Sequence, residues 1–234
     1  PSQIPLRLVG SEMCIRDSVR NMSAMFKGAT SYNQFNSQWD VSSVTDMSSM
    51  YEGATSYNKT PSGWGTGTAN VRNMSSMFKG ATSFDQLLNN WDVSSVTDMS
   101  SMFEGATSFT RSFGGWANQG TGTANVQNMS NMFKGATSYN GFVTAFDVSE
   151  VTDMSGMFEG ASAYNRALGN WNNQGSGTAS VGNFSNMFKN AVAFTTYFGN
   201  INVSGAVNMS GMFEGAISID NNANAWGSDL AGVT

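Results

Sequence analysis

Apolar positions recur along this chain in a fixed pattern that is repeated eight times. Each copy has apolar residues at i, i+3 and i+4, as at Met47, Met50 and Tyr51, preceded by Asn or Asp and followed by Gly-Ala or Asn-Ala. This spacing is typical of one face of a short helix, for which Asn or Asp is a preferred N-cap and Gly or Asn a preferred C-cap. The pattern therefore predicts a short capped helix in every copy.

A second apolar stretch follows each predicted helix. An aromatic residue or Ile comes after the cap, and Trp, Phe or Ile follows seven residues later, as at Tyr32 and Trp39. Segments that end in Trp-Asp-Val have the composition and alternation of a short strand. One copy is too small to bury its own apolar side, whereas stacked copies bury a continuous core.

The spacing of the copies defines their arrangement. Counted from the residue after the recurring Asn or Asp, successive copies start 25, 27, 25, 30, 25, 30 and 25 residues apart. The longer copies carry Gly- and Thr-rich inserts at 63–71, 116–126 and 171–181. We therefore predict a repeat solenoid of about eight coils of 25–30 residues over 19–234. Each coil would be a short capped helix plus a short strand of a parallel sheet, and the array is expected to be a fragment of a longer one.

The first residues of the chain do not follow the repeat. Residues 8–18 are similar to the in-frame translation of a transposon-type sequencing adapter, so we interpret 1–18 as a non-native leader. This segment contains Cys14, the chain's single cysteine, and the repeats contain neither cysteine nor histidine.

Composition argues against several functions. Charged residues make up 12% of the chain and its net charge is -5, which argues against a nucleic-acid partner. No apolar run approaches the roughly 18 residues that a membrane span needs, so we expect no membrane insertion by this chain. Histidine, the commonest general base and metal ligand, is absent. We expect no enzyme activity, no cofactor and no metal, and we interpret the evenly spread Met residues as core rather than as a Cu(I) site.

The last residue of each predicted helix alternates between Lys and Glu. Equivalent residues of stacked coils lie about 5 Å apart, so alternation places opposite charges next to each other and opposes a one-coil slip. We predict an inter-coil charge ladder formed by Lys27, Glu52, Lys79, Glu104, Lys134, Glu159, Lys189 and Glu214.

Three further groups of polar residues have two interpretations each. Asp40, Asp92 and Asp147 would either bind calcium or form turns. The Asn-Met-Ser and Asn-Phe-Ser sequences are glycosylation sequons or helix caps. A Thr column that starts at Thr30 and runs through five coils would form either a turn or a flat ice-binding face.

The inserts supply a candidate binding surface. Repeat proteins commonly carry insertions on their binding face, although a solvated turn is the simpler interpretation. The predicted binding ridge consists of Trp116, Asn118, Gln119, Trp171, Asn173 and Gln174.

The repeat resembles that of a known family. The segment NQFNSQWDVSSVTDMSSMYEGATSYN at 33–58 is similar to the repeat of BspA-type leucine-rich surface proteins, including the group first collected from mycoplasma lipoproteins. The resemblance runs from about residue 19 to 230, and the inserts in alternate coils depart from it. It implies a leucine-rich-repeat-like fold, an extracellular or cell-surface location, and adhesion or protein binding without catalysis.

These observations lead to three functional hypotheses. The first is non-catalytic binding or adhesion to a protein or glycan at a surface. The second is end-to-end self-association into a fibre, in which the Glu214 end of one molecule would meet the Lys27 end of the next in the correct alternation. The third, more remote hypothesis is ice binding.

Overall fold

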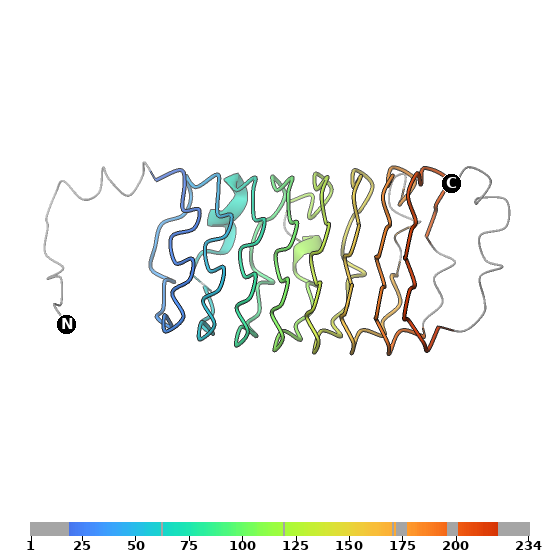
Figure 1. The fold of residues 1–234 in the computed structure, drawn as a ribbon. Coiled ribbons are helices and arrows are strands. Elements are labelled where there is room, and N and C mark those ends of the chain that lie inside the picture. Colours follow the sequence, from blue (N-terminus) through green and yellow to red (C-terminus); the bar gives the residue numbers. More distant parts are fainter. Residues whose placement is uncertain are drawn as a thin grey trace, which may run out of the picture.

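The structure, a computed structural model, describes residues 19–61, 63–118, 120–169, 171, 177–195 and 201–219. These residues form successive coils that are stacked in sequence order along one axis (Figure 1). Isolated parallel bridges join the Asn or Asp of each coil to that of the next, beginning with Asn21 and Asp46 and ending with Asn183 and Asn208. The register of the stack is therefore set at the predicted Asn/Asp column. The predicted leader at 1–18 lies outside the described residues.

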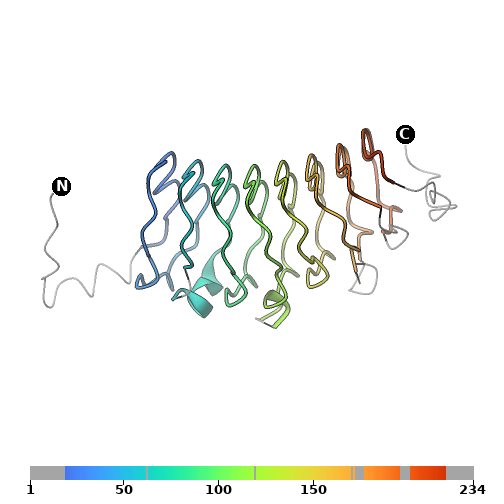
Figure 2. The ribbon, with the colours of Figure 1, turned by 90° about the horizontal axis from the view of Figure 1, so that it is seen from below.

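The predicted helix-plus-strand solenoid is wrong. The helical residues among those described are all 3-10, namely η1 (Gly65–Asn70), η2 (Trp116–Asn118) and Trp171, and no strand is formed in the described part of the chain. Both helices belong to inserts and lie along the same edge of the stack (Figure 2). Their short length fits their role as connections between coils. Within the described part of the chain, no helix has the length and apolar character needed to span a membrane.

Two left-handed residues in each coil explain the absence of the predicted helices. The third residue after each Asn or Asp has a positive φ, for example 55° at Ser76 and 56° at Asn131. The residue four positions later, Gly in seven coils and Asn190 in the other, is left-handed as well, with φ of 67° at Gly80. An α-helix of L-residues cannot pass through such a conformation without a steric cost. The i, i+3, i+4 apolar spacing therefore belongs to a series of tight turns.

The hydrogen bonds of these turns alternate between the coil and its neighbour. In the coil that begins at Asn73, the N–H groups of residues 74, 76, 78 and 80 donate to the carbonyl oxygens of residues 98, 100, 102 and 104, at 2.7–2.9 Å. The N–H groups of Met77 and Lys79 instead close turns onto the carbonyls of Met74 and Ser76. Half of the backbone donors are thus used between coils, whereas a helix would use them all internally.

The predicted strands that end in Trp-Asp-Val are not formed, and turns flank these residues instead. The N–H of Val44 donates to the carbonyl of Val41 at 3.0 Å, and the N–H of Ser42 donates to Asp40 Oδ1 at 2.9 Å. The N–H of Trp39 donates to the carbonyl of Asn36 at 3.1 Å, so one turn precedes Trp39 and another follows Val41. The segment between these turns forms no bridge to a neighbouring coil among the described residues.

The predicted helix N-cap role of the Asn/Asp column is wrong, because no helix follows it in the described coils, but its side chains do accept a backbone hydrogen bond. In all eight coils the Oδ1 atom accepts a hydrogen bond from the N–H of the Ser two residues later, at 2.7–3.1 Å. This geometry is an Asx turn rather than a helix N-cap. It fixes the chain direction just before the first left-handed residue.

The core runs through the whole stack as columns of Met and aromatic side chains. Met47, Met74 and Met99 have no exposed surface, which confirms their predicted core position. Aromatic rings of successive coils are stacked, with centroid distances of 5.5 Å between Tyr51 and Phe78 and 5.6 Å between Phe78 and Phe103. Each coil therefore contributes one layer to a continuous apolar interior, and every layer is completed only by the coils on either side.

Candidate binding surface

The predicted binding ridge loses both of its tryptophans to the core. Trp116 and Trp171 are fully buried, and their indole N–H groups donate to the carbonyls of Leu88 at 2.8 Å and Val143 at 3.2 Å. Asn118 is exposed at the end of η2. Gln119, Asn173 and Gln174 lie outside the described residues. A ligand on the native surface cannot contact either indole. The prediction that these two tryptophans form a binding ridge is therefore wrong.

The inserts themselves are fastened to the next coil by buried threonines. Thr68, Thr123 and Thr178 are each fully buried. Their hydroxyls donate to carbonyls in the following coil, for example from Thr68 to Asp92 at 2.8 Å and from Thr123 to Asp147 at 2.9 Å. These threonines of the Gly-Thr-rich inserts have a structural role, because each buried hydroxyl is hydrogen-bonded to a backbone carbonyl of the following coil.

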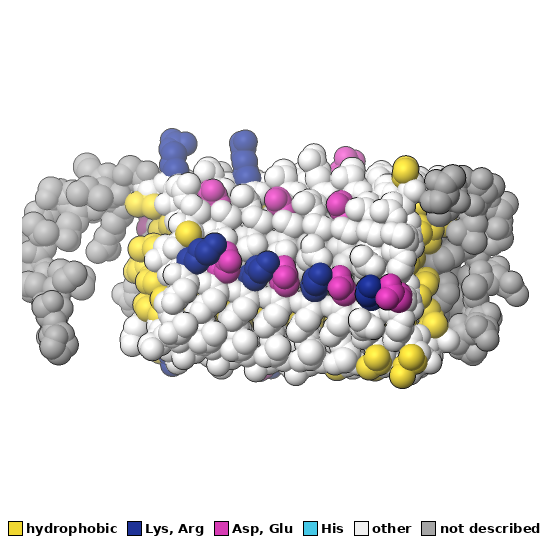
Figure 3. Space-filling view, in the orientation of Figure 1, with side chains coloured by type: hydrophobic (Ala, Val, Ile, Leu, Met, Phe, Trp, Pro, Cys, Tyr) yellow, Lys and Arg dark blue, Asp and Glu magenta, His cyan; other side chains and the backbone are white. Residues whose placement is uncertain are grey.

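The alternating Lys and Glu residues form one row along the stack (Figure 3). Four ion pairs join each Lys to the Glu of the following coil, at 2.8–3.0 Å, namely Lys27–Glu52, Lys79–Glu104, Lys134–Glu159 and Lys189–Glu214. Among the described residues, no ion pair within 4 Å links a Glu to the Lys after it. The row is therefore a series of pairs.

The electrostatic effect of the row still extends beyond the pairs. Partial burial alone would raise the pKa of Glu52, but hydrogen bonds from Ser49 and Lys27 outweigh it. The charge of Lys79 also lowers this pKa, so the next Lys acts on Glu52 without contacting it. The net result is a pKa of Glu52 below its usual value.

Reversing one charge tests this row. Glu104→Lys places a third ammonium between Lys79 and Lys134, and we expect it to lower the free energy of unfolding by about 0.5–1 kcal/mol at low salt. Urea unfolding in 20 mM and in 1 M NaCl measures this effect, because the Debye length falls to about 3 Å at 1 M salt. The neutral control Glu104→Gln should lose less. Equal stability of Glu104→Lys and the original chain at low salt would show that the row contributes nothing.

The remaining polar candidates are engaged in local hydrogen bonds. Asp92 and Asp147 accept the N–H of the residue two positions later at 3.0 Å, as Asp40 does. Hydrogen bonds from Ser42 hold the pKa of the Asp40 carboxyl below its usual value. In the Thr column, the Thr55 hydroxyl donates to the carbonyl of Thr30 at 3.3 Å. These contacts assign turn-forming and coil-linking roles to residues for which the sequence left two interpretations open.

A different surface carries exposed apolar side chains at a regular interval. Phe35, Leu87 and Phe142 occupy the same position in the first, third and fifth coils, and 68%, 50% and 49% of each residue is exposed. The second, fourth and sixth coils carry Lys59, Arg111 and Arg166 one position before the equivalent residue. We call these six residues the apolar–cationic stripe.

Each cation of the stripe has a contact with the preceding coil. Lys59 and Arg166 lie over an aromatic ring, and Arg111 pairs with a carboxylate. Lys59 Nζ lies 4.8 Å from the ring centroid of Phe35, and the guanidinium of Arg166 lies 4.6 Å from that of Phe142. Arg166 Nε donates to the carbonyl of Asn140 at 3.1 Å. Arg111 pairs with Asp85 Oδ2 at 2.8 Å. Lys59 and Arg166 have no ion pair among the described residues, so two of the three cations can meet an external anion.

Comparison with protein families supports the repeat. A family model described as "Mycoplasma protein of unknown function, DUF285" matches residues 16–116 and again residues 119–226. The chain belongs to this DUF285 family. The two consecutive matches make it a tandem repeat protein. No curated protein and no solved structure matches the chain.

The stripe is visible in the sequence of the DUF285 repeats as an alternation between successive coils, which the sequence analysis missed. At the position of Phe35, Leu87 and Phe142, the alternate coils have Thr60, Ser112 and Ala167. A large apolar residue that is exchangeable for Thr, Ser or Ala does not belong to the core, because a cavity of that size would be costly. Comparing the coils in pairs, rather than one by one, therefore reveals the stripe.

Proposed function

We propose that this chain is a non-catalytic binding protein that attaches to an extended protein or glycan outside the cell through the apolar–cationic stripe. The observation that carries the proposal is the exposure of a large apolar side chain in the first, third and fifth coils, with a cation over the ring of Phe35 and of Phe142. The resemblance to BspA-type surface proteins supports the adhesive role and the extracellular or cell-surface location.

The spacing of the stripe suits a long ligand. Two coils advance by about 10 Å along the stack if each coil rises by one strand spacing. Exposed aromatic rings and cations are typical anchors of binding surfaces, and each such contact is weak by itself. Contacts at a regular interval on a rigid stack engage one ligand together, so their combined affinity exceeds that of any single contact.

Substitution of the two phenylalanines tests this role. The double variant Phe35→Ser, Phe142→Ser should bind an array of immobilised glycans and extracellular-matrix proteins at least tenfold more weakly. Each substitution removes one aromatic anchor and its contact with a cation. Ser is compatible with the fold here, since Ser112 occupies the equivalent position. The matched control is Val207→Ser with Ile217→Ser, which removes two exposed apolar side chains outside the stripe. Equal binding by both double variants, or no binding by the original chain, would contradict the proposal.

Self-association into a fibre is the second candidate, because the first described coil presents an apolar end face. Met25 is 53% exposed, whereas the equivalent Met50 and Met77 are fully buried by a preceding coil. A pocket of about 380 Å³ at this face is lined in part by Met22, Met25 and Trp39. Figure 3 shows hydrophobic side chains gathered at this end. Light scattering across a concentration series distinguishes the candidates: growing rods support a fibre, and a constant monomer mass contradicts it.

A further inference from the structure

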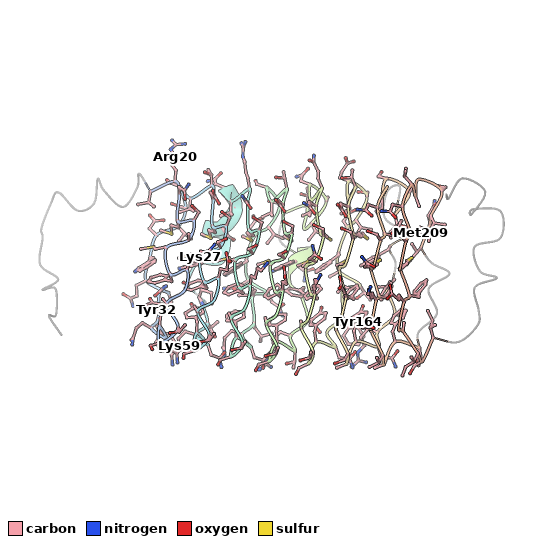
Figure 4. All side chains as sticks on the ribbon, in the orientation of Figure 1. Arg20, Lys27, Tyr32, Lys59, Tyr164 and Met209 are labelled. Atoms are coloured by element: carbon pink, nitrogen blue, oxygen red, sulfur yellow. The ribbon has the colours of Figure 1, made fainter. Side chains whose placement is uncertain are left out.

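We propose that a pocket between Arg20 and Arg72 binds a tetrahedral oxyanion, that is, a sulfate or phosphate group. This inference is independent of the apolar–cationic stripe: Arg20 and Lys59 lie at opposite edges of the stack (Figure 4). The oxyanion could be a free ion or an ester on a larger molecule, and the experiment below separates the two.

The pocket is built from polar residues of several coils. It has a volume of about 290 Å³ and is lined by Arg20, Ser43, Thr45, Asn70, Arg72 and Ser95. Arg20, Thr45 and Arg72 precede the Asn/Asp column in three successive coils, and the other three residues come from the adjoining connections. The stacking of coils thus brings two guanidinium groups to the same concave surface.

The charge of the lining is uncompensated. Arg20 and Arg72 are exposed, and within the described residues neither forms an ion pair with a carboxylate. The Asn/Asp column, which follows Arg20 and Arg72 in the sequence, contains Asp46 and Asp98, whose Oδ1 atoms already accept the N–H groups two residues ahead at 2.8–2.9 Å. The lining itself contains two positive charges and no carboxylate.

The hydrogen-bond donors favour an anion with more than two oxygen atoms. Each guanidinium can donate two parallel hydrogen bonds, and one arginine is enough to satisfy a planar carboxylate. The Ser43 and Ser95 hydroxyls have no protein partner in the described part of the chain, so they remain available. Asn70 uses one amide hydrogen on the carbonyl of Ser42 at 2.7 Å and has a second. A tetrahedral group accepts from both arginines and from these neutral donors.

The two arginines are not required by the fold. At the same position, Thr45, Thr97 and Thr152 donate to the carbonyl of the preceding coil, at 3.1–3.2 Å. The fifth, seventh and eighth coils carry Gln127, Gly182 and Val207 there. The repeat therefore accepts polar, small and apolar residues at this position, and the fold does not require arginine at 20 or at 72.

Titration by NMR tests the pocket. We expect sodium sulfate and sodium phosphate, added at constant ionic strength, to shift the Nε–Hε signals of Arg20 and Arg72 saturably, while sodium acetate binds at least tenfold more weakly. In Arg20→Gln with Arg72→Gln, saturable binding should be lost; Gln127 shows that the fold accepts this residue. The control Arg111→Gln with Arg166→Gln makes the same charge change at the stripe and should retain the binding.

The source of the oxyanion is tested by two monoesters, glucose 6-sulfate and glucose 6-phosphate. Binding at least tenfold tighter than that of the inorganic ion identifies an esterified ligand, and tighter binding of the inorganic ion identifies a free one. Absence of saturable shifts, equal binding of acetate, or unchanged binding in Arg20→Gln with Arg72→Gln would overturn the proposal. The two sites are tested by different variants and different ligands, so failure of this site and failure of the proposed adhesive function are distinguishable.

Discussion

Trp116→Ala is expected to lower the free energy of unfolding by about 3–5 kcal/mol, the cost of removing a large buried aromatic side chain. The indole of Trp116 stacks on Phe146 at a centroid distance of 5.7 Å and contacts Phe113 at 4.4 Å. Its loss leaves a cavity between two coils and removes the N–H donor to the Leu88 carbonyl. Urea unfolding measures the change, and hydrogen exchange should show loss of amide protection in the coils on either side of residue 116.

Trp116→Phe is the matched control, because Phe146 occupies the equivalent position in the next coil. It retains an aromatic ring and loses only the hydrogen bond and part of the volume, so we expect a smaller cost of about 1–3 kcal/mol. The opposite result would be unchanged stability of Trp116→Ala with loss of ligand binding. That outcome would return Trp116 to the surface role that the sequence predicted.

Gly115→Ala is expected to cost about 1–3 kcal/mol or more, because a methyl group has no space at this position. An alanine Cβ at residue 115 would overlap the backbone carbonyl of Asn89 in the preceding coil. The equivalent Gly63 lies in the same way against the carbonyl of Ser37. Backbone cannot move aside as a flexible side chain can, so the two coils would have to separate locally. Thermal unfolding of the variant measures this loss.

The adjacent glycine provides an internal control for this prediction. A Cβ at Gly114 would meet nothing within 4 Å, and its backbone is not left-handed. Gly114→Ala should therefore leave the stability nearly unchanged or raise it by up to about 1 kcal/mol, since it reduces the freedom of the unfolded chain. If both alanine variants lose the same stability, the close approach of the coils at Gly115 is not the cause.

The missed stripe and pocket share one physical origin. Phe35 and Lys59 are 24 positions apart in the sequence and belong to different coils, as do Arg20 and Arg72. Their proximity depends on the stack, and nothing in the local pattern around either residue indicates it. The error over Trp116 and Trp171 has the converse origin: their place in the inserts suggested exposure, whereas the ring column of the neighbouring coils buries them.

The sequence by itself determined the repeat, its register and its buried columns. Asn or Asp before each turn, Met and aromatic residues at fixed spacing, and alternating Lys and Glu all lie where the pattern places them. Only the tertiary structure decided the path of the backbone. The i, i+3, i+4 spacing fits an α-helix as well as a series of turns with left-handed residues at positions such as Ser76 and Gly80. The turns form instead of a helix because every second N–H donates to the next coil, and these bonds exist only when the coils are stacked.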